Sequence, residues 1–469
     1  MPTTPVSLDE LTKFCRRKGF VYPGSEIYGG LANTWDYGDL GVKLKDNLKQ
    51  AWKRHFIFSR ADMSELDAGI LMNQRVWEAS GHTETFADAL VDDKRTGHRF
   101  RADHLIEEQL GIDVEGKTAT EITEIIRTGN LLNPLTKEPG EWTEARYMNL
   151  MFETNRDKIN PGNTETRVYL RPETAQGIFV QFKNILQTQR AKLPFGVGQI
   201  GKAFRNEITP GNFIFRVVEF EQMEIEYFIA PPQNDTEWNE YFEQWLSAQE
   251  EFLTNTLGLS GENLQQKEHA PEKLSHYSKR TVDYEFNFPF GFSELTGLAY
   301  RTDFDLRAHQ NHSGQKLEYT DPATGEKSVP HVIEPTVGVD RLVLAVLCNH
   351  YRQEELEKDS RTVMAFPFDI APYKLAVLPL MKKDGLKEKS LEIYQELLAK
   401  GIMCDYDDAG SIGKRYRRQD ENGTPWCLAV DYQTMEDNTV TLRHRDTMEQ
   451  VRIPLSDLTA ALLKEKFDA

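Results

Sequence analysis

The stretch from 197 to 228 reads VGQIGKAFRNEITPGNFIFRVVEFEQMEIEYF, and the rest of the expected fold is built around it. β-Branched and aromatic residues fill both of its ends, and ITPGN between them is typical of a turn, so it predicts an antiparallel hairpin. Residues two apart share a face of a strand. A face with an arginine, an aromatic ring and several carboxylates is a poor core but suits a flat ligand that carries a phosphate and an amine. The residues predicted to share such faces are Gly201, Ala203, Arg205 and Glu207 on the first arm, and Phe220, Gln222, Glu224 and Glu226 on the second.

The composition indicates a soluble intracellular protein. A chain of 469 residues predicts roughly two to four domains. The net charge of −18 argues against a generally basic surface but leaves room for a local nucleic-acid site. The four cysteines form no CxxC pair, which favours a reducing cytoplasm over a disulfide framework or a cysteine zinc site. The N-terminus lacks a signal peptide, and the longest apolar run, 342–348, is too short to cross a bilayer.

Before the hairpin, the sequence predicts helices and one insertion. Ser7 and Glu10 form a capping box for a first helix that should end at Gly19. A second helix is expected from Val42 to about Phe56. Residues 84–165 are charged and weakly patterned, which indicates an insertion, with a helix at 103–110. A strand, a turn and a helix beginning near Pro172 should follow at 168–186.

After the hairpin, residues 230–280 resemble a second insertion, whose aromatic helix near 237–256 is expected to pack within that insertion. Apolar positions alternate from Leu298 to Leu306 and predict a strand. Another strand is expected at 332–337, and Gly338 should open an apolar helix. Prolines near 361–373 mark a boundary, beyond which a β-α-β rhythm predicts a small α/β domain with helices at 386–400 and 411–421.

The combination of features resembles the class II aminoacyl-tRNA synthetases. Arg205 followed by Glu207 is usually only a strand ion pair, and Arg341 in a helix is usually solvated. Together, a strand pair ending in Phe-Glu and a later strand-to-helix Gly-Val-Asp-Arg are the pattern by which that class binds ATP on an antiparallel sheet. The first motif of the class, a helix and strand at the dimer interface, would fall near 42–60.

A closer resemblance is to the homodimeric glycyl-tRNA synthetases, and it covers about residues 66–450. It implies an α+β catalytic domain at 1–365, with an antiparallel sheet flanked by helices, and a C-terminal α/β anticodon-binding domain at 366–469. It also implies a cytoplasmic homodimer that joins glycine to tRNA(Gly) using ATP and Mg²⁺. Two positions depart from the family pattern: Asp39 replaces a proline and Val218 an arginine. The blocks that carry the resemblance are EASGH, YLRPETAQGIF, FRNEITP, FEQMEIEYF, ELTGLAYRTDFDL, HVIEPTVGVDRL and GSIGKRYRRQDENGTPWC.

The resemblance implies roles for the nucleotide site. Adenylate formation spreads negative charge over phosphates, so fixed cations should dominate catalysis. Arg205 would hold the α-phosphate, while Arg216 and Arg341 meet the outer phosphates, because the planar guanidinium can bind two phosphate oxygens. Glu207 would contact the adenine amino group and Phe220 stack on the ring. Glu294 is the expected magnesium carboxylate, against the simpler interpretation of a structural strand glutamate. The other ATP-site positions implied are Asn206, Phe215, Val217, Val218, Glu219, Leu295, Gly338, Val339 and Asp340.

The resemblance likewise implies a glycine pocket. Glycine offers only an ammonium, a carboxylate and two Cα hydrogens, so selection should combine acidic groups with walls that exclude a Cβ. Overfilling such a pocket by a methyl would cost roughly 1–3 kcal/mol. Arg101 resembles the arginine that covers the amino acid, although a salt bridge within the insertion is the alternative. The residues implied are the acids Glu173, Glu224 and Glu334, with Arg301 to position them, together with Arg101, Phe220, Glu221, Gln222, Met223, Pro335, Thr336, Val337 and Gly338.

The KRYRR run at 414–418 places four cations early in a predicted helix of an acidic protein. A charge run is usually just solvated, but this context resembles the family's anticodon-binding domain and predicts contact with RNA phosphates. The predicted tRNA-binding residues are Lys414, Arg415, Arg417 and Arg418.

Three other interpretations stay open. The chain could activate serine, threonine, proline or histidine instead, which amino-acid-dependent pyrophosphate exchange would reveal. It could be a synthetase-like subunit without activity, although such a protein should have lost Arg205 and Arg341. A generic nucleotide-binding enzyme would leave the KRYRR domain unexplained.

Overall fold

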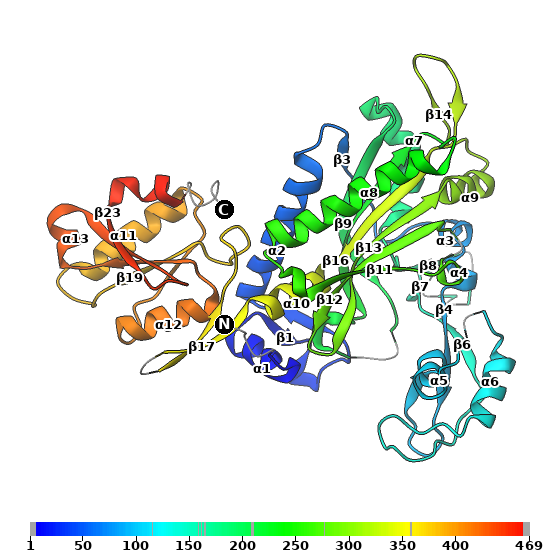
Figure 1. Cartoon of the computed structure of the whole chain (residues 1–469), viewed down its shortest axis with the longest axis horizontal. Helices are drawn as coiled ribbons and strands as arrows, with labels where there is room; N and C mark the ends of the chain where they lie inside the picture. Colours follow the sequence, from blue (N-terminus) through cyan, green and yellow to red (C-terminus); the bar gives the residue numbers. More distant parts are fainter. Residues whose placement is uncertain are drawn as a thin grey trace.

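The centre of the molecule is one twisted sheet (Figure 1). The computed structural model describes residues 6–114, 116–157, 159–160, 162–163, 166–207, 211–275, 277–356 and 359–462. Within these residues the sheet has seven strands, and every neighbouring pair is antiparallel except β3 with β9. In spatial order they are β11 (Leu264–Glu268), β12 (Arg280–Phe288), β13 (Gly291–Thr302), β16 (His331–Gly338), β10 (Glu219–Ile229), β9 (Phe195–Phe204) and β3 (Met63–Glu65).

The predicted pairing of the two arms at 197–228 is confirmed. Phe220 lies opposite Ala203, and Gln222 lies opposite Gly201. The first arm was predicted too long, because β9 ends at Phe204. Arg205 and Glu207 therefore follow the strand, although the Arg205 N–H still bonds across, to the Val218 carbonyl at 3.0 Å. The connection contains a short helix, η4 (Phe213–Phe215), and residues 208–210 of the predicted turn lie outside the described chain.

Helices cover the sheet face to which the odd-numbered residues of β10 point. Met223, Ile225 and Tyr227 join a large apolar cluster on that side. The helices that contribute to this cluster are α1 (Leu8–Lys18), α2 (Asp39–Lys53) with its continuation η2 (Arg54–Phe58), α8 (Asp235–Glu251) with its continuation η5 (Phe252–Thr256), and α10 (Val339–His350). The expectation that the aromatic helix packs within its own insertion is wrong. Trp238 of α8 stacks on Tyr300 of β13, with ring centroids 4.3 Å apart.

The opposite face is covered at one end only. There α7 (Ala175–Gln189) and the strand ends form a second apolar cluster, which includes Phe228 of β10 and Leu306 of α9 (Phe304–Ser313). Phe220, Gln222, Glu224 and Glu226 point to this face because they alternate with the residues of the first cluster. The open end of this face is where a ligand can reach polar side chains.

Most predicted element boundaries agree with the structure. Ser7 caps α1, Gly19 ends it with a φ of 80°, and Gly338 precedes α10. The second helix begins at Asp39, earlier than predicted, and Asp39 accepts a 2.7 Å hydrogen bond from the Tyr373 hydroxyl. The helix predicted near Pro172 begins at Ala175, after β8 (Arg167–Tyr169). The strand predicted to continue to Leu306 ends at Thr302, where the chain turns into α9.

Residues between 87 and 149 form a lobe that projects from the sheet (Figure 1). It has its own apolar cluster, which includes Leu105, Ile122 and Ile126. The helix predicted at 103–110 is present. The lobe consists of β4 (Ala87–Asp92), β5 (Arg99–Arg101), β6 (Arg146–Asn149), α5 (Ala102–Leu110) and α6 (Ala119–Thr128). The short elements near its junction with the sheet are α3 (Gln74–Ala79), α4 (His82–Thr85) and β7 (Glu153–Asn155), which pairs with β8.

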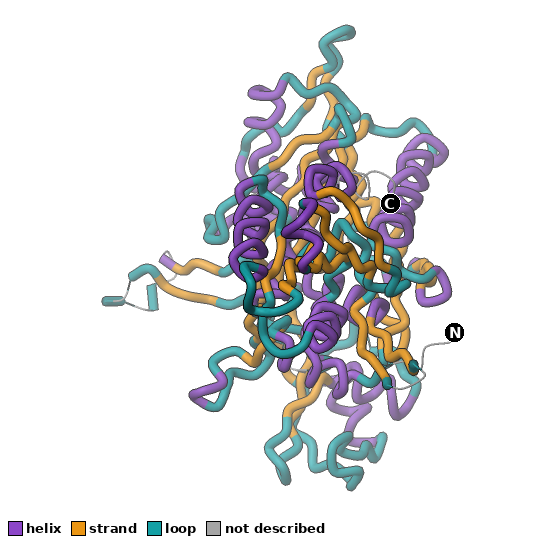
Figure 2. The backbone as a smooth tube through the Cα atoms, turned by 90° about the vertical axis from the view of Figure 1, so that its left-hand side faces the viewer, coloured by secondary structure: helices purple, strands orange, loops and turns teal. Residues whose placement is uncertain are grey.

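The predicted C-terminal α/β domain is confirmed and faces the viewer in Figure 2, with helices packed against its strands. The hairpin of β17 (Tyr351–Glu355) and β18 (Ser360–Met364) precedes it. The domain contains β19 (Leu375–Pro379), α11 (Leu386–Ala399), β20 (Cys404–Tyr406), α12 (Ile412–Asn422), β21 (Trp426–Val430), α13 (Tyr432–Asp437), β22 (Thr439–His444) and β23 (Gln450–Pro454).

The state of the cysteines and the character of the helices complete the description of the fold. All four cysteines are free, as the sequence indicated. Within the described residues, no helix combines the length and apolar character that crossing a membrane would require.

Candidate active site

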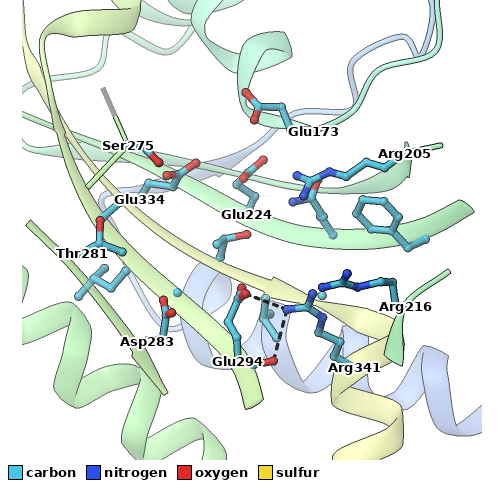
Figure 3. A pocket seen from close by; sticks show the side chains of 18 of the residues that line it. Glu173, Arg205, Arg216, Glu224, Ser275, Thr281, Asp283, Glu294, Glu334 and Arg341 are labelled. Carbon is cyan, nitrogen blue, oxygen red and sulfur yellow. Dashed lines mark hydrogen bonds and ion pairs between the residues drawn. The ribbon is translucent and has the colours of Figure 1, made fainter. Parts of the chain in front are cut away.

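A pocket of about 360 Å³ opens on the uncovered face of the central sheet (Figure 3). Strands β10, β12, β13 and β16, the loop after β9 and the start of α10 contribute its walls. Three labelled arginines lie toward one side and the carboxylates of Glu224 and Glu334 toward the other (Figure 3). Of the residues predicted for the site, the lining includes Glu173, Arg205, Glu207, Phe215, Arg216, Val217, Phe220, Gln222, Glu224, Glu294, Arg301, Glu334, Thr336, Val337, Gly338, Asp340 and Arg341.

On the arginine side of the pocket, an aromatic ring and a carboxylate contact the guanidinium groups. The Arg205 Nε donates to the Pro172 carbonyl at 3.0 Å, and its guanidinium lies 5.4 Å from the centroid of the Phe220 ring. The Arg341 Nη1 lies 3.0 Å from Glu294 Oε2, and this charge lowers the pKa of Glu294. Because the Glu294 side chain is half exposed, its carboxylate is accessible from the pocket. This side of the pocket can therefore receive a polyanion.

The acidic side is buried and densely hydrogen-bonded. Arg301 Nη1 donates to both Glu334 oxygens, at 2.8 and 3.0 Å, and its other nitrogens donate to Asp305 at 2.8 and 2.9 Å. Glu224 accepts a hydrogen bond from the Thr174 hydroxyl. Glu173 lies 3.3 Å from the His82 Nε2. The β10–β16 register places Glu224 opposite Thr336, which brings residues more than a hundred positions apart to one wall.

Burial dominates the electrostatics of these acids. It raises the pKa of Glu334 well above its ordinary value despite Arg301, and it raises that of Glu224 together with the charge of Glu173. Burial acts in the same direction on Glu173, but His82, Arg301 and a hydrogen bond from Gln176 outweigh it and lower the Glu173 pKa. A cluster with more carboxylates than cations attracts a small cationic group such as an ammonium.

The small residues of the first arm have another role than predicted. Gly201 and Ala203 do not line the pocket. A Cβ at Gly201 would lie 2.2 Å from the Arg171 Nη2, so glycine leaves room for this buried arginine. Arg171 donates to the carbonyls of Lys202 and Ala68 at 2.6 and 2.8 Å. Gly201 thus allows the Arg171 side chain to pack against β9, outside the pocket.

Several predicted site residues lie outside the lining. Met223, Leu295 and Val339 point into the apolar core on the other side of the sheet. Glu221 also faces that side, where Lys45 pairs with it at 2.6 Å. Arg101 forms salt bridges with Asp88 at 3.0 Å and Asp103 at 2.6 Å within the lobe, which is the alternative that the sequence left open. The remaining predicted positions that do not line the pocket are Asn206, Val218, Glu219 and Pro335.

Sequence reasoning missed other lining residues. His269 Nε2 lies 2.6 Å from Asp283 Oδ2 in the pocket wall, and burial together with the charge of Glu294 raises the pKa of Asp283 to about 6. His269 falls in 230–280, the segment interpreted as a second insertion, whereas Asp283 lies just beyond it in β12. The alternation of Val282, Tyr284 and Phe286 was the signal that β12 belongs to the sheet.

The KRYRR run is largely committed to intramolecular contacts. Arg415 is buried, and its guanidinium donates to the carbonyls of Asp408 at 2.9 Å and Gly410 at 2.6 Å as well as to that of Pro379. The prediction that Arg415 is presented to RNA is therefore wrong: it holds the loop before α12. Arg418 pairs with Asp407 at 2.6 Å, whereas Lys414 is exposed.

Sequence comparisons agree with this arrangement. Residues 158–350 match the family described as "tRNA synthetase class II core domain (G, H, P, S and T)", and residues 374–465 match "Anticodon binding domain". The antiparallel sheet, its arginine-lined pocket and these matches define a class II aminoacyl-tRNA synthetase.

Full-length relatives narrow the class. The chain is 52% identical over 467 residues to the glycine–tRNA ligase of Alkaliphilus oremlandii (strain OhILAs), covering 98% of each chain. It is 51% identical over 464 residues to that of Bacillus thuringiensis subsp. konkukian (strain 97-27) and 49% over 470 residues to that of Staphylococcus aureus (strain JH9), covering 98% of this chain and 99% of each relative. The chain belongs to the glycine–tRNA ligase family.

Proposed function

We propose that this pocket joins glycine to ATP as glycyl-adenylate, and that the chain then transfers the glycyl group to the 3′ end of tRNA(Gly). The observation that carries the proposal is the division of one pocket into an arginine side and a buried acidic side. The glycine carboxylate would lie between them, where its oxygen attacks the α-phosphate and pyrophosphate departs. The phosphate of the adenylate can then accept the proton of the tRNA hydroxyl.

On the nucleotide side, Arg205 would hold the α-phosphate while Phe220 and Glu207 take the adenine. Arg216 and Arg341 would meet the outer phosphates as fixed cations, which need no reorganisation as charge develops. Glu294 fits a magnesium ion, because a half-exposed carboxylate at the phosphate side is the kind of oxygen ligand Mg²⁺ shares with phosphates. Bound there, the ion would neutralise phosphate charge.

On the amino-acid side, Glu173, Glu224 and Glu334 would surround the ammonium. The Thr336 hydroxyl, which has no hydrogen-bond partner among the described residues, also faces this side. Arg301 would position Glu334. Arg101 stays a predicted cover for the amino acid, although it would have to leave Asp88 and Asp103 to act. We also propose domain limits of 1–365 and 366–469, and tRNA contact by Lys414, Arg417 and Arg418.

We further propose a homodimer in the cytoplasm. Ile27, Tyr28 and Leu31 precede α2 in the chain and Phe58 ends its continuation η2; all four are exposed apolar side chains, and a second chain could cover them. Reduced cysteines suit a cytoplasmic compartment. The mass of the native protein, measured by light scattering after size exclusion, tests the dimer.

Amino-acid-dependent exchange of pyrophosphate into ATP tests the activity. We expect exchange with glycine, and rates at least about tenfold lower with alanine or serine, because an added Cβ overfills the pocket. Equal exchange with alanine or serine would refute the glycine specificity. No exchange with any amino acid would favour a synthetase-like subunit without activity.

A further inference from the structure

Glu226 is a fully buried glutamate to which the proposed chemistry gives no role. It follows Glu224 by two residues on β10 and so points to the same face of the sheet. It does not line the pocket, whereas Glu224 and Glu334 do. Carboxylate oxygens of these three residues lie within 4.8 Å of one another. Glu226 therefore stands directly behind the two acids that face the ligand.

The three acids differ in their partners. Glu334 is paired with Arg301 at 2.8 Å, and Glu224 accepts a hydrogen bond from Thr174. Neither oxygen of Glu226 accepts a hydrogen bond from a described residue. An ionised carboxylate in that position would be unusually costly, because it is fully buried and makes no salt bridge among the described residues.

Among the described residues, the charged groups around Glu226 supply no cation that is not already paired. They are Glu224 on its own strand, Glu334 on β16, Arg301 on β13 and Asp305 on α9. Arg301 is already shared by Glu334 and Asp305. Adjacent buried carboxylates that cannot all ionise share a proton. Consistent with this, burial and the charge of Glu334 raise the pKa of Glu226 well above its ordinary value.

We propose that Glu226 is an uncharged carboxylic acid, a positioning residue that donates a hydrogen bond to the carboxylate of Glu334 or Glu224 and orients both toward the substrate ammonium. The ammonium role rests on the proposed function. The proton stays on Glu226, so the pocket gains an oriented donor without a further negative charge. An additional ionised acid there would repel its neighbours and widen the pocket.

Two substitutions separate this role from that of an ionised ligand. Glu226→Gln keeps an uncharged donor of the same size, so the KM for glycine in pyrophosphate exchange should change less than about threefold. Glu226→Leu removes the donor and should raise that KM at least about tenfold, with the KM for ATP unchanged. A Glu226→Gln variant whose glycine KM rises about as much as that of Glu224→Gln would overturn the proposal.

An infrared measurement tests the protonation without any turnover. The wild-type protein should show the C=O stretch of a protonated carboxylic acid near pH 7, and Glu226→Gln should lose it. Glu285→Gln is the matched control, because Glu285 is a buried sheet glutamate paired with Lys267 at 2.8 Å and has a lowered pKa, so its loss should leave that band intact. An unchanged band in Glu226→Gln would refute the proposal. Absence of glycine-dependent exchange in wild-type protein would refute the function alone.

Discussion

Lys45 Nζ lies 2.6 Å from Glu221 Oε2 on the face of the sheet opposite the pocket. The same ammonium lies 3.3 Å from Asp340 Oδ1, and Asp340 also accepts the Glu221 N–H at 3.0 Å. Glu221 follows Phe220, and Asp340 precedes Arg341. One lysine of α2 therefore ties together the strand and the helix that present two proposed ATP-binding side chains.

Lys45→Met should lower the free energy of unfolding by about 3 kcal/mol, because it leaves the buried Asp340 without its cation and leaves Glu221 with the longer contact to Lys49. Urea unfolding measures this. Lys49→Met is the control, since Lys49 is more exposed and lies 3.5 Å from Glu221, and it should cost less than about 1 kcal/mol. Equal losses would show that the buried network adds no stability of its own.

Arg205→Ala should reduce glycine-dependent pyrophosphate exchange by at least about 10²-fold, because it removes a fixed cation from the developing phosphate charge. Binding of tRNA, measured by filter retention, should stay within about twofold. Arg307→Ala, an exposed arginine paired with Asp303, should change neither property. Parallel loss of exchange and of tRNA binding would contradict the separation of the two sites.

Glu334→Gln should raise the KM for glycine by roughly 10- to 100-fold and leave that for ATP almost unchanged, because a charge-assisted contact contributes about 1.5–3 kcal/mol. Initial rates of exchange, with each substrate varied in turn, measure both constants. A variant whose KM for ATP rises while its KM for glycine does not would contradict the assignment of Glu334 to the glycine side of the pocket.

Arg415→Met should lower the free energy of unfolding of the C-terminal domain by about 3 kcal/mol, because buried carbonyls lose their donor. Lys414→Met, one residue away and exposed, should change it by less than about 0.5 kcal/mol. Urea unfolding followed by tryptophan fluorescence, to which Trp426 of this domain contributes, distinguishes them. A stable Arg415→Met variant with weakened tRNA binding would restore the RNA role predicted from the sequence.

His350 should make stability depend on pH. Its Nε2 donates to the Leu257 carbonyl at 2.8 Å, and burial lowers its pKa from 6.5 to about 4. Between these two pKa values, His350 is protonated in the unfolded chain but neutral in the folded chain. The free energy of unfolding therefore falls as the pH drops from about 6.5 to 4, by up to about 3 kcal/mol. Urea unfolding of wild type and His350→Gln across this range should show a shallower decline in the variant. Parallel curves would contradict the assignment.

The local sequence pattern was enough to predict those parts of the fold that depend on neighbouring residues. The alternation on either side of 208–212 predicted the β9–β10 pair, and Ser7, Gly19 and Gly338 marked helix ends, because capping and pairing depend on residues a few positions apart. The ordered blocks also identified most of the pocket lining. Residue type and order were enough there, since phosphate and ammonium each require a narrow set of side chains.

Tertiary packing decided which of these side chains can contact a ligand. In the sequence, Arg415 cannot be told apart from its cationic neighbours, but it is buried and its guanidinium donates to backbone carbonyls. Gly201 leaves room for the Arg171 side chain and not for a ligand. Glu226 alternates like Glu224 but lies behind it, where no described residue donates a hydrogen bond to it. Sequence alone predicted the fold class, the class of chemistry and the two sides of the pocket. Contacts between residues tens to hundreds of positions apart determined which charged side chains line the pocket, because burial and pairing depend on partners that the periodicity of a sequence does not reveal.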